Sequence, residues 1–209
     1  MLKELIRVNR ALKEERLVIF TWGNASCRSV DKKSMFIKPS GVPFEELQEN
    51  KISQVDLSTA KHLRGLQPSV DAPTHIVLYN AFPDINAIVH THSKYCTIFA
   101  QSKLSIPCLG TTHSDYFYEK NTGLKIIQYF NENNVLPMEI PAALSPSHGV
   151  FVWGETLTDA LKNAIVLENV AEMAYKTLQL CYNRSIDFNS MLLNKHFLRK
   201  HGNNKYYGQ

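Results

Sequence analysis

One segment restricts the possible folds more than any other. A short, mostly apolar run, Ile85 to Val89, leads into His90-Thr91-His92, and a helix-like stretch, Ser93 to Gln101, follows. In an extended strand, alternate side chains point to the same face, so His90 and His92 can present two imidazole nitrogens to one metal ion. The alternative, one core histidine and one surface histidine, stays open for the pair taken alone.

His148 is a third candidate ligand. It lies in Ser145-Pro146-Ser147-His148-Gly149, just before the strand-like Val150-Phe151-Val152-Trp153. Three histidines leave one coordination position open, as a catalytic zinc or a similar divalent ion requires, whereas a structural zinc site is closed by four protein ligands. With His148 included, the sequence favours a metal site with an open position.

Helical and strand-like segments alternate along the chain without repeats or low-complexity linkers. The spacing of apolar residues predicts helices and strands. The helices are residues 2–12, 73–82 (ended by Pro83), 157–174 and 191–200 (capped by Ser190), and the strands are 17–20 and 35–37. The 209 residues are 44% hydrophobic and 20% charged, which is enough for one buried core. We therefore expect a single α/β domain over residues 1–209.

The composition argues against two classes of partner. No apolar segment approaches the length of a membrane span, and the first five residues lack the hydrophobic block of a signal peptide, so we expect a cytoplasmic protein without a membrane partner. The net charge is only +4, with a basic concentration near the C-terminus. Those basic residues, with Tyr206 and Tyr207, could stack on single-stranded nucleic acid, but a nucleic-acid-binding protein would carry more positive charge, so we expect none.

Two glycine-containing segments are typical of anion-binding turns. Trp22-Gly23-Asn24-Ala25-Ser26 follows the first predicted strand, and Lys38-Pro39-Ser40-Gly41 follows the second. Glycine lets backbone amides approach an oxyanion, Asn and Ser donate hydrogen bonds, and Lys38 can supply charge to a phosphate monoester. The alternative is two ordinary tight turns. A nearby metal site favours phosphate binding, because a substrate held at both ends has its reacting bond fixed between them.

Several segments together carry a family resemblance over nearly the whole chain. They are Thr21-Trp22-Gly23-Asn24, Ile37-Lys38-Pro39-Ser40-Gly41, Ile88-Val89-His90-Thr91-His92-Ser93 and Gly110-Thr111-Thr112-His113-Ser114-Asp115-Tyr116-Phe117. The chain resembles the L-ribulose-5-phosphate 4-epimerases, within the class II aldolase/epimerase family. Its closing segments, 194–202 and Tyr206-Tyr207-Gly208-Gln209, resemble the C-terminus of these epimerases, which the wider class II aldolases do not share.

The resemblance implies a fold, an assembly and a metal site. The fold is an α/β/α sandwich around a central, largely antiparallel sheet, and the assembly is a cyclic homotetramer in which the tail, 203–209, reaches a neighbouring subunit. The resemblance matches His90, His92 and His148 to zinc ligands and Asp71 to the acidic residue beside the metal. Cobalt, manganese and nickel suit such ligands as well. The alternative for Asp71 is an N-cap before Pro73.

The implied reaction interconverts L-ribulose 5-phosphate and D-xylulose 5-phosphate, in arabinose or ascorbate catabolism. Inverting a carbon that bears no acidic proton requires breaking a bond to it, so the C3–C4 bond opens by retro-aldol cleavage and forms again. The resemblance places Asp115 and Tyr207 as proton donors on opposite sides of the aldehyde, with His196 positioning Asp115. The positions that it implies for the sugar phosphate are Gly23, Asn24, Lys38, Ser40, Gly41, Ser69 and Val70.

Two features depart from the family pattern. The segment after Asp115 is shorter than in the family. Val70 stands where the family usually has a second serine, so one phosphate hydrogen bond of about 1.5–3 kcal/mol should be missing. Three interpretations follow, in this order: an epimerase, a class II aldolase that releases its aldehyde, and a metal-binding member that has lost catalysis. The segment 111–115 and the tail favour the first, and the two departures favour the last.

Overall fold

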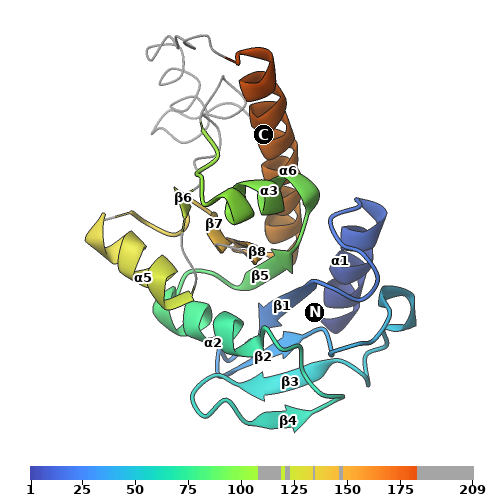
Figure 1. Ribbon diagram of the computed structural model, residues 1–209. Helices are drawn as coiled ribbons and strands as arrows, with labels where there is room; N and C mark the ends of the chain where they lie inside the picture. Colours follow the sequence, from blue (N-terminus) through green and yellow to red (C-terminus); the bar gives the residue numbers. More distant parts are fainter. Residues whose placement is uncertain (108–118, 121–122, 134, 146–147, 183–209) are drawn as a thin grey trace, which may run out of the picture.

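The computed structural model describes residues 1–107, 119–120, 123–133, 135–145 and 148–182. Within these residues, strands form one sheet in the order β4-β3-β2-β1-β5-β8-β7-β6 (Figure 1). Neighbouring strands are antiparallel except for the parallel pair β6 and β7. The bounds are β1 Asn24–Arg28, β2 Ser34–Ile37, β3 Ser53–Asp56, β4 His62–Arg64, β5 Ala87–Thr91, β6 Glu119–Lys120, β7 Ala142–Ser145 and β8 Gly149–Gly154.

Helices cover both faces of this sheet. Helices α1 (Leu2–Glu14), α3 (Lys94–Ser102) and α6 (Leu157–Leu180) share one apolar cluster with the sheet, and α2 (Ala72–Ala81) and α5 (Gly123–Glu132) share the other. Successive residues of β5 enter different clusters, because a strand alternates its side chains between faces. The predicted α/β/α sandwich around a largely antiparallel sheet is therefore confirmed.

The register of the central strands sets up the site. Strand β5 pairs with β1 on one side and with β8 on the other. His90 lies opposite Asn24 of β1 and opposite Phe151 of β8. Directly opposed residues of antiparallel strands have neighbouring side chains on the same face. The three side chains therefore form one row across the sheet.

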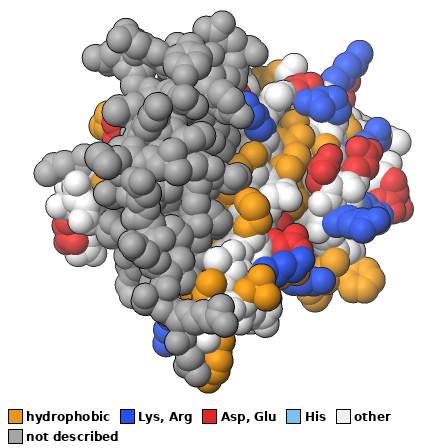
Figure 2. Space-filling view, turned by 90° about the horizontal axis from the view of Figure 1, so that it is seen from above, with side chains coloured by type: hydrophobic (Ala, Val, Ile, Leu, Met, Phe, Trp, Pro, Cys, Tyr) orange, Lys and Arg blue, Asp and Glu red, His pale blue; other side chains and the backbone are white. Residues whose placement is uncertain are grey.

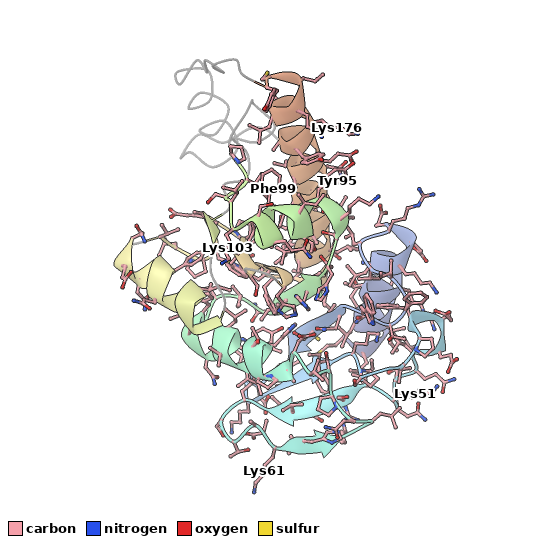
Figure 3. The ribbon with its side chains drawn as sticks, in the orientation of Figure 1. Lys51, Lys61, Tyr95, Phe99, Lys103 and Lys176 are labelled. Atoms are coloured by element: carbon pink, nitrogen blue, oxygen red, sulfur yellow. The ribbon has the colours of Figure 1, made fainter. Side chains whose placement is uncertain are left out.

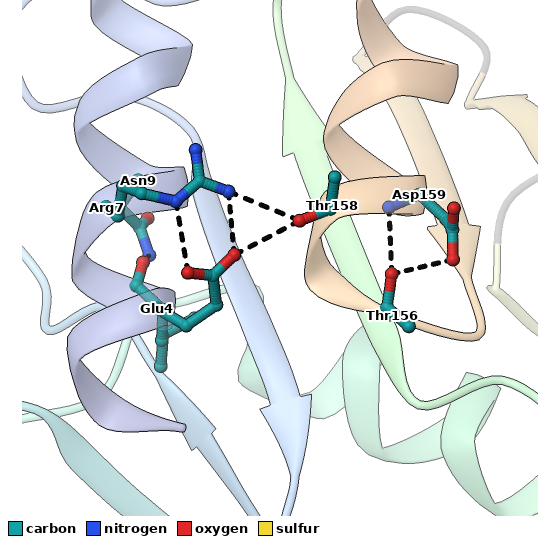
Figure 4. A network of polar contacts seen from close by, with 7 residues as sticks. Glu4, Arg7, Asn9, Thr156, Thr158 and Asp159 are labelled. Atoms are coloured by element: carbon teal, nitrogen blue, oxygen red, sulfur yellow. Dashed lines mark hydrogen bonds and ion pairs between the residues drawn. The ribbon is translucent and has the colours of Figure 1, made fainter.

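Polar contacts join α1 to α6 on one face (Figure 4). Arg7 donates to the carboxylate of Glu4 at 2.7 Å and to the hydroxyl of Thr158 at 3.2 Å. At the start of α6, Thr156 caps the helix by accepting from the backbone N–H of Asp159 at 3.1 Å. Such a cap satisfies a backbone donor that the helix itself leaves unpaired.

Helix α3 is held to α6 at its N-terminus. The two backbone N–H groups of Tyr95 and Cys96 donate to the carboxylate of Glu168, at 2.8 and 3.0 Å. Figure 3 shows Tyr95 beside Lys176, whose ammonium lies 6.0 Å from the centre of the tyrosine ring. Since α3 begins two residues after His92, this contact fixes the chain just beyond a candidate ligand.

Most of the predicted elements that fall on described residues are confirmed, and one is wrong. The helices predicted at 2–12, 73–82 and 157–174 are α1, α2 and α6, and the strand at 35–37 is β2. The predicted strand Leu17 to Phe20 does not form: Phe20 has a φ of 52° and is 77% exposed. The first strand is β1 instead, so Trp22 and Gly23 precede it and do not follow a strand. The predicted helix 191–200 lies outside the described residues.

The described surface is mixed in charge. On the face in Figure 2, Lys and Arg side chains are interspersed with Asp and Glu. None of the helices in the described part of the chain is both long and apolar enough to cross a membrane.

Candidate metal centre

The three predicted histidine ligands lie together where the central strand β5 ends and its neighbour β8 begins. His90 is in β5, His92 directly follows it, and His148 directly precedes β8. Because β5 and β8 are antiparallel neighbours, the end of one lies beside the start of the other. The two Nε2 atoms of His90 and His92 are 3.1 Å apart, and one ring nitrogen from each of the three residues lies within 4.8 Å of the others. This donor set fits a single divalent ion.

The ring of His90 is fixed in an orientation suited to metal binding. Its Nδ1 atom lies 2.8 Å from the backbone carbonyl oxygen of Val150, so Nδ1 carries the proton and donates it. The Nε2 lone pair is then free for a metal. The ring also stacks on Phe151, with centres 4.2 Å apart and planes 17° apart.

Burial favours the neutral form of His90 and His92. It lowers the pKa of His90 to about 4, with Asp71 opposing the shift and His148 adding to it. Burial also lowers the pKa of His92. Neutral imidazoles keep the lone pairs that a metal ion requires, so little proton release accompanies binding at neutral pH.

Asp71 occupies the N-cap position of α2, but its side chain does not cap the helix. One carboxylate oxygen accepts from Asn24 at 2.8 Å and from Ser69 at 3.2 Å. The other oxygen lies 3.9 Å from Nε2 of His90 and 4.0 Å from Nε2 of His148. The carboxylate is therefore directed at the histidines, and its place beside a metal stays a prediction.

The ionisation of Asp71 reflects opposing effects. Burial raises the pKa of its carboxyl, but the nearby histidines His90 and His75 and the hydrogen bonds from Asn24 and Ser69 outweigh burial and hold the pKa below its usual value. The group is therefore a carboxylate at neutral pH, which suits a metal ligand.

Gly149 is a position that the sequence analysis did not single out. A Cβ atom placed there would overlap the carbonyl oxygen of Thr91 and would lie 2.9 Å from Cδ2 of His92 and 3.4 Å from Cε1 of His90. Only glycine lets the backbone of β8 approach the two imidazoles this closely. The only sign in the sequence that glycine is required at position 149 is that the residue directly follows His148.

A cavity of about 180 Å³ opens beside the histidines. Its lining joins candidate metal ligands to candidate phosphate-binding residues and to three of their neighbours in sequence. The predicted site residues are Gly23, Lys38, Ser40, Gly41, Ser69, Val70, Asp71, His92 and His148, and the neighbours are Thr21, Trp22 and Pro39. Thus three turns that are far apart in sequence meet at one cavity.

Lys38 is the buried cation at this cavity. Its ammonium donates to the carbonyl oxygen of Thr21 at 3.1 Å and lies 4.7 Å from the centre of the Phe44 ring. Burial lowers its pKa to about 8, so the side chain is mostly charged at neutral pH. A buried ammonium with carbonyl and aromatic neighbours favours an incoming anion, because the anion offsets part of the cost of burying the charge.

Asn24 links the two ends of the site. Its Nδ2 atom donates to Ser69 at 3.1 Å as well as to Asp71, and its Oδ1 atom is buried without a hydrogen-bond partner among the described residues. The remaining predicted site residues, Asp115, His196 and Tyr207, lie outside the described residues, as does the tail.

Known proteins with similar sequences are enzymes of sugar-phosphate chemistry. Residues 3–175 match the family described as the class II aldolase and adducin N-terminal domain. The L-ribulose-5-phosphate 4-epimerase UlaF of Salmonella paratyphi C (strain RKS4594) is 39% identical over 227 residues, covering 99% of this chain and 97% of the relative. The protein of the same name from Salmonella choleraesuis (strain SC-B67) gives the same values. The aligned stretch is longer than this chain of 209 residues, so these relatives contain residues that it lacks.

Solved structures agree in fold. An L-fuculose 1-phosphate aldolase has a TM-score of 0.77 at 22% identity, covering 95% of this chain and 94% of that protein. The L-fuculose 1-phosphate aldolase from Glaciozyma antarctica PI12 has a TM-score of 0.78 at 18% identity, covering 94% and 80%. The family match, the epimerase relatives and the shared fold lead to one conclusion: this chain belongs to the class II aldolase family.

Proposed function

We propose that this protein is a zinc-dependent L-ribulose-5-phosphate 4-epimerase that interconverts L-ribulose 5-phosphate and D-xylulose 5-phosphate. The observation that carries the proposal is the pairing of two unlike sites on one cavity. Asp71, His92 and His148 line one part of it beside the buried His90, and the buried cation Lys38 lies among turn residues in another part. The epimerase relatives, which cover nearly the whole chain, support this substrate.

In the proposed site, His90, His92 and His148 hold the ion, with Asp71 beside it. A bound divalent ion supplies a Lewis acid that stabilises the negative charge developing on the substrate oxygens as the C3–C4 bond breaks. Cobalt, manganese or nickel would suit the same nitrogen and oxygen donors. Phe151 and the Val150 carbonyl hold His90 in place before any ion arrives.

The other end of the cavity holds the phosphate in this proposal. Lys38 supplies positive charge, Ser40 and Ser69 supply hydroxyl donors, and the turns at Gly23 and Gly41 expose backbone amides. Val70 offers no hydrogen bond, although its exposed side chain lines the cavity where a serine would donate. Fixing both ends orients the C3–C4 bond between them.

Proton transfer to and from the aldehyde oxygen is assigned, by family resemblance, to Asp115 and Tyr207, with His196 positioning Asp115. We also propose a cytoplasmic, single-domain subunit in a cyclic tetramer, in which the tail 203–209 brings Tyr207 to the neighbouring active site. Replacing Tyr207→Phe should leave zinc content and assembly unchanged while strongly reducing epimerisation. Full activity in that variant would remove Tyr207 from the mechanism.

The deciding experiment follows the products of the zinc-loaded protein acting on L-ribulose 5-phosphate. Dominant D-xylulose 5-phosphate is the expected result. Accumulation of dihydroxyacetone and glycolaldehyde phosphate, the two fragments of C3–C4 cleavage, would identify an aldolase that releases its aldehyde. If neither appears while zinc is bound, the chain is a metal-binding member without this activity, and the short segment after Asp115 and Val70 become the sites to restore.

A further inference from the structure

A polar seam joins β1 to α2 beneath the metal centre. Residues 24, 26 and 28 point to one face of β1, and each makes hydrogen bonds to α2 or its flanking residues. Asn24 bonds Asp71 at the start of the helix. Arg28 bonds the backbone carbonyl oxygens of Tyr79, Phe82 and Ile85 near its end. The seam therefore runs the length of the helix whose first residue follows Asp71.

The centre of the seam is a completely buried chain of three side chains. The hydroxyl of Ser26 lies 2.7 Å from Nδ1 of His75 and 2.8 Å from the hydroxyl of Tyr79. All three residues are inaccessible to solvent. Burial lowers the pKa of His75 to about 3, with Asp71 opposing the shift, so its ring is neutral.

The hydrogen bonds between Tyr79, Ser26 and His75 have one favourable arrangement of protons. If Tyr79 donates to Ser26 and Ser26 donates to Nδ1 of His75, both hydroxyl protons have acceptors. In the reverse direction Ser26 would donate to Tyr79, and the Tyr79 proton would lose Ser26 as its acceptor. The proton of His75 is then on Nε2, which has no hydrogen-bond partner among the described residues.

His75 contacts the surroundings of the metal centre in two ways. His75 lies one helical turn after Asp71, and its backbone N–H donates to the Asp71 carbonyl oxygen at 3.1 Å. The ring of His75 also packs edge-on against Phe151, with centres 5.8 Å apart, and Phe151 in turn stacks on His90. His75 thus contacts the supports of two candidate ligands without being a ligand itself.

We propose that His75 is a positioning residue for the metal centre: the Tyr79–Ser26–His75 chain locks α2 against β1, which sets Asp71, and its contact with Phe151 supports the ring of His90. This inference rests on the proposed metal site. Outer partners of this kind orient ligands, and their loss typically lowers metal affinity by about 10- to 100-fold.

The test measures zinc affinity by competition with a chromophoric chelator, together with urea unfolding of the zinc-free protein. Ser26→Ala removes the central hydroxyl, and Cys27→Ala is the matched control. Each substitution deletes one γ atom at adjacent buried positions of β1, but Cys27 faces the opposite core. Ser26→Ala should weaken zinc binding by roughly 10-fold or more, while Cys27→Ala should stay within about twofold of wild type.

Tyr79→Phe is a second variant that keeps the ring and removes only the terminal hydroxyl. It should weaken zinc binding by a smaller factor, roughly threefold to tenfold. Lower stability with wild-type zinc affinity in both variants would overturn the positioning role and leave the metal site standing. Failure of the wild-type protein to bind zinc would overturn the metal site and, with it, the role of His75.

Discussion

The two ends of the cavity are built from different kinds of structure. The histidine end is anchored in the central sheet: His90 is 1% exposed in β5, which pairs with β1 and β8 on either side. His92, which is exposed, and His148, which is half-buried, lie directly beside the ends of these strands. The rest of the lining consists of turns, in which Trp22 is 54% and Val70 83% exposed, and in which Gly41 has a positive φ angle.

Because of this difference, the two ends should tolerate amino-acid substitutions to different degrees. Side chains held by strands and by second hydrogen bonds have little freedom to move, so a metal site built on them is formed before the ion binds. Turns at the surface adjust more readily and accept substitution. We therefore expect changes at the histidine end to be severe and changes at the turn end to be graded.

The largest effect should come from removing a ligand at the histidine end. His92→Ala should lower zinc affinity by roughly a hundredfold or more, since each ligand of a zinc site contributes about 3 kcal/mol. Chelator competition measures the affinity, and epimerisation should fall with it. Near-wild-type zinc affinity would exclude His92 as a ligand. It would also contradict the expectation that changes at the histidine end are severe.

Alanine substitutions at two glycines, one at each end of the cavity, test this difference directly. At Gly149 a new Cβ would meet the Thr91 carbonyl and the rings of His90 and His92, whereas at Gly41 it would meet nothing within 4 Å. Gly149→Ala should therefore weaken zinc binding by about tenfold or more, because the rings must move. Gly41→Ala should keep zinc affinity and cost about 1 kcal/mol of folding free energy, from its φ of 68° alone. Equal zinc affinities in the two variants would contradict a rigid histidine end.

At the turn end, Lys38→Met should weaken the binding of inorganic phosphate by about tenfold, the loss of one charged hydrogen bond, and leave zinc affinity unchanged. The wild-type affinity for phosphate should also depend on pH. A bound anion favours the protonated ammonium and raises its pKa, so affinity is full below pH 8 and declines as pH rises through the free-state pKa of about 8. Titration calorimetry from pH 7 to 10 measures both effects, and a flat wild-type profile would remove Lys38 from the anion site.

The smallest change should be a gain. Val70→Ser restores a hydroxyl at an exposed position that lines the cavity. Because residue 70 is exposed to water, its hydrogen bond to the phosphate should be worth less than the about 1.5–3 kcal/mol of a typical bond to a charged group, about 1 kcal/mol. KM for L-ribulose 5-phosphate should therefore fall by roughly fivefold with little change in kcat. An unchanged KM would mean that residue 70 does not contact the phosphate.

The ligand pattern was visible in the sequence because it is local. His90 and His92 are two residues apart at the end of one strand, and His148 lies directly before another, so three histidines at strand ends were enough to suggest a shared metal site. The family resemblance supplied the layered fold and the place of Asp71. The prediction that the turns near residues 23, 40 and 70 share one site depended on the same resemblance, because these turns are far apart in the sequence.

Strand β1 was missed for a physical reason. Its residues at positions 24, 26 and 28 are polar because they face the hydrogen-bonding seam with α2, and the residues between them, Ala25 and Cys27, are small, so the strand carries only a weak hydrophobic signal. The apolar residues Leu17 to Phe20 were chosen in its place, although only Leu17 and Val18 are buried. The need for glycine at position 149 was equally hidden, because it depends on side chains that arrive from β5.

The antiparallel pairing of β5 and β8 also has a consequence for the order of folding. The segment that carries His148 reaches the His-Thr-His pair only after β8 has docked along β5, a contact between regions about 58 residues apart in sequence. Before that step the chain offers an ion only a two-nitrogen site. We therefore expect a metal ion bound at this site to strengthen the completed sheet and slow its opening, and we expect folding to begin without the ion.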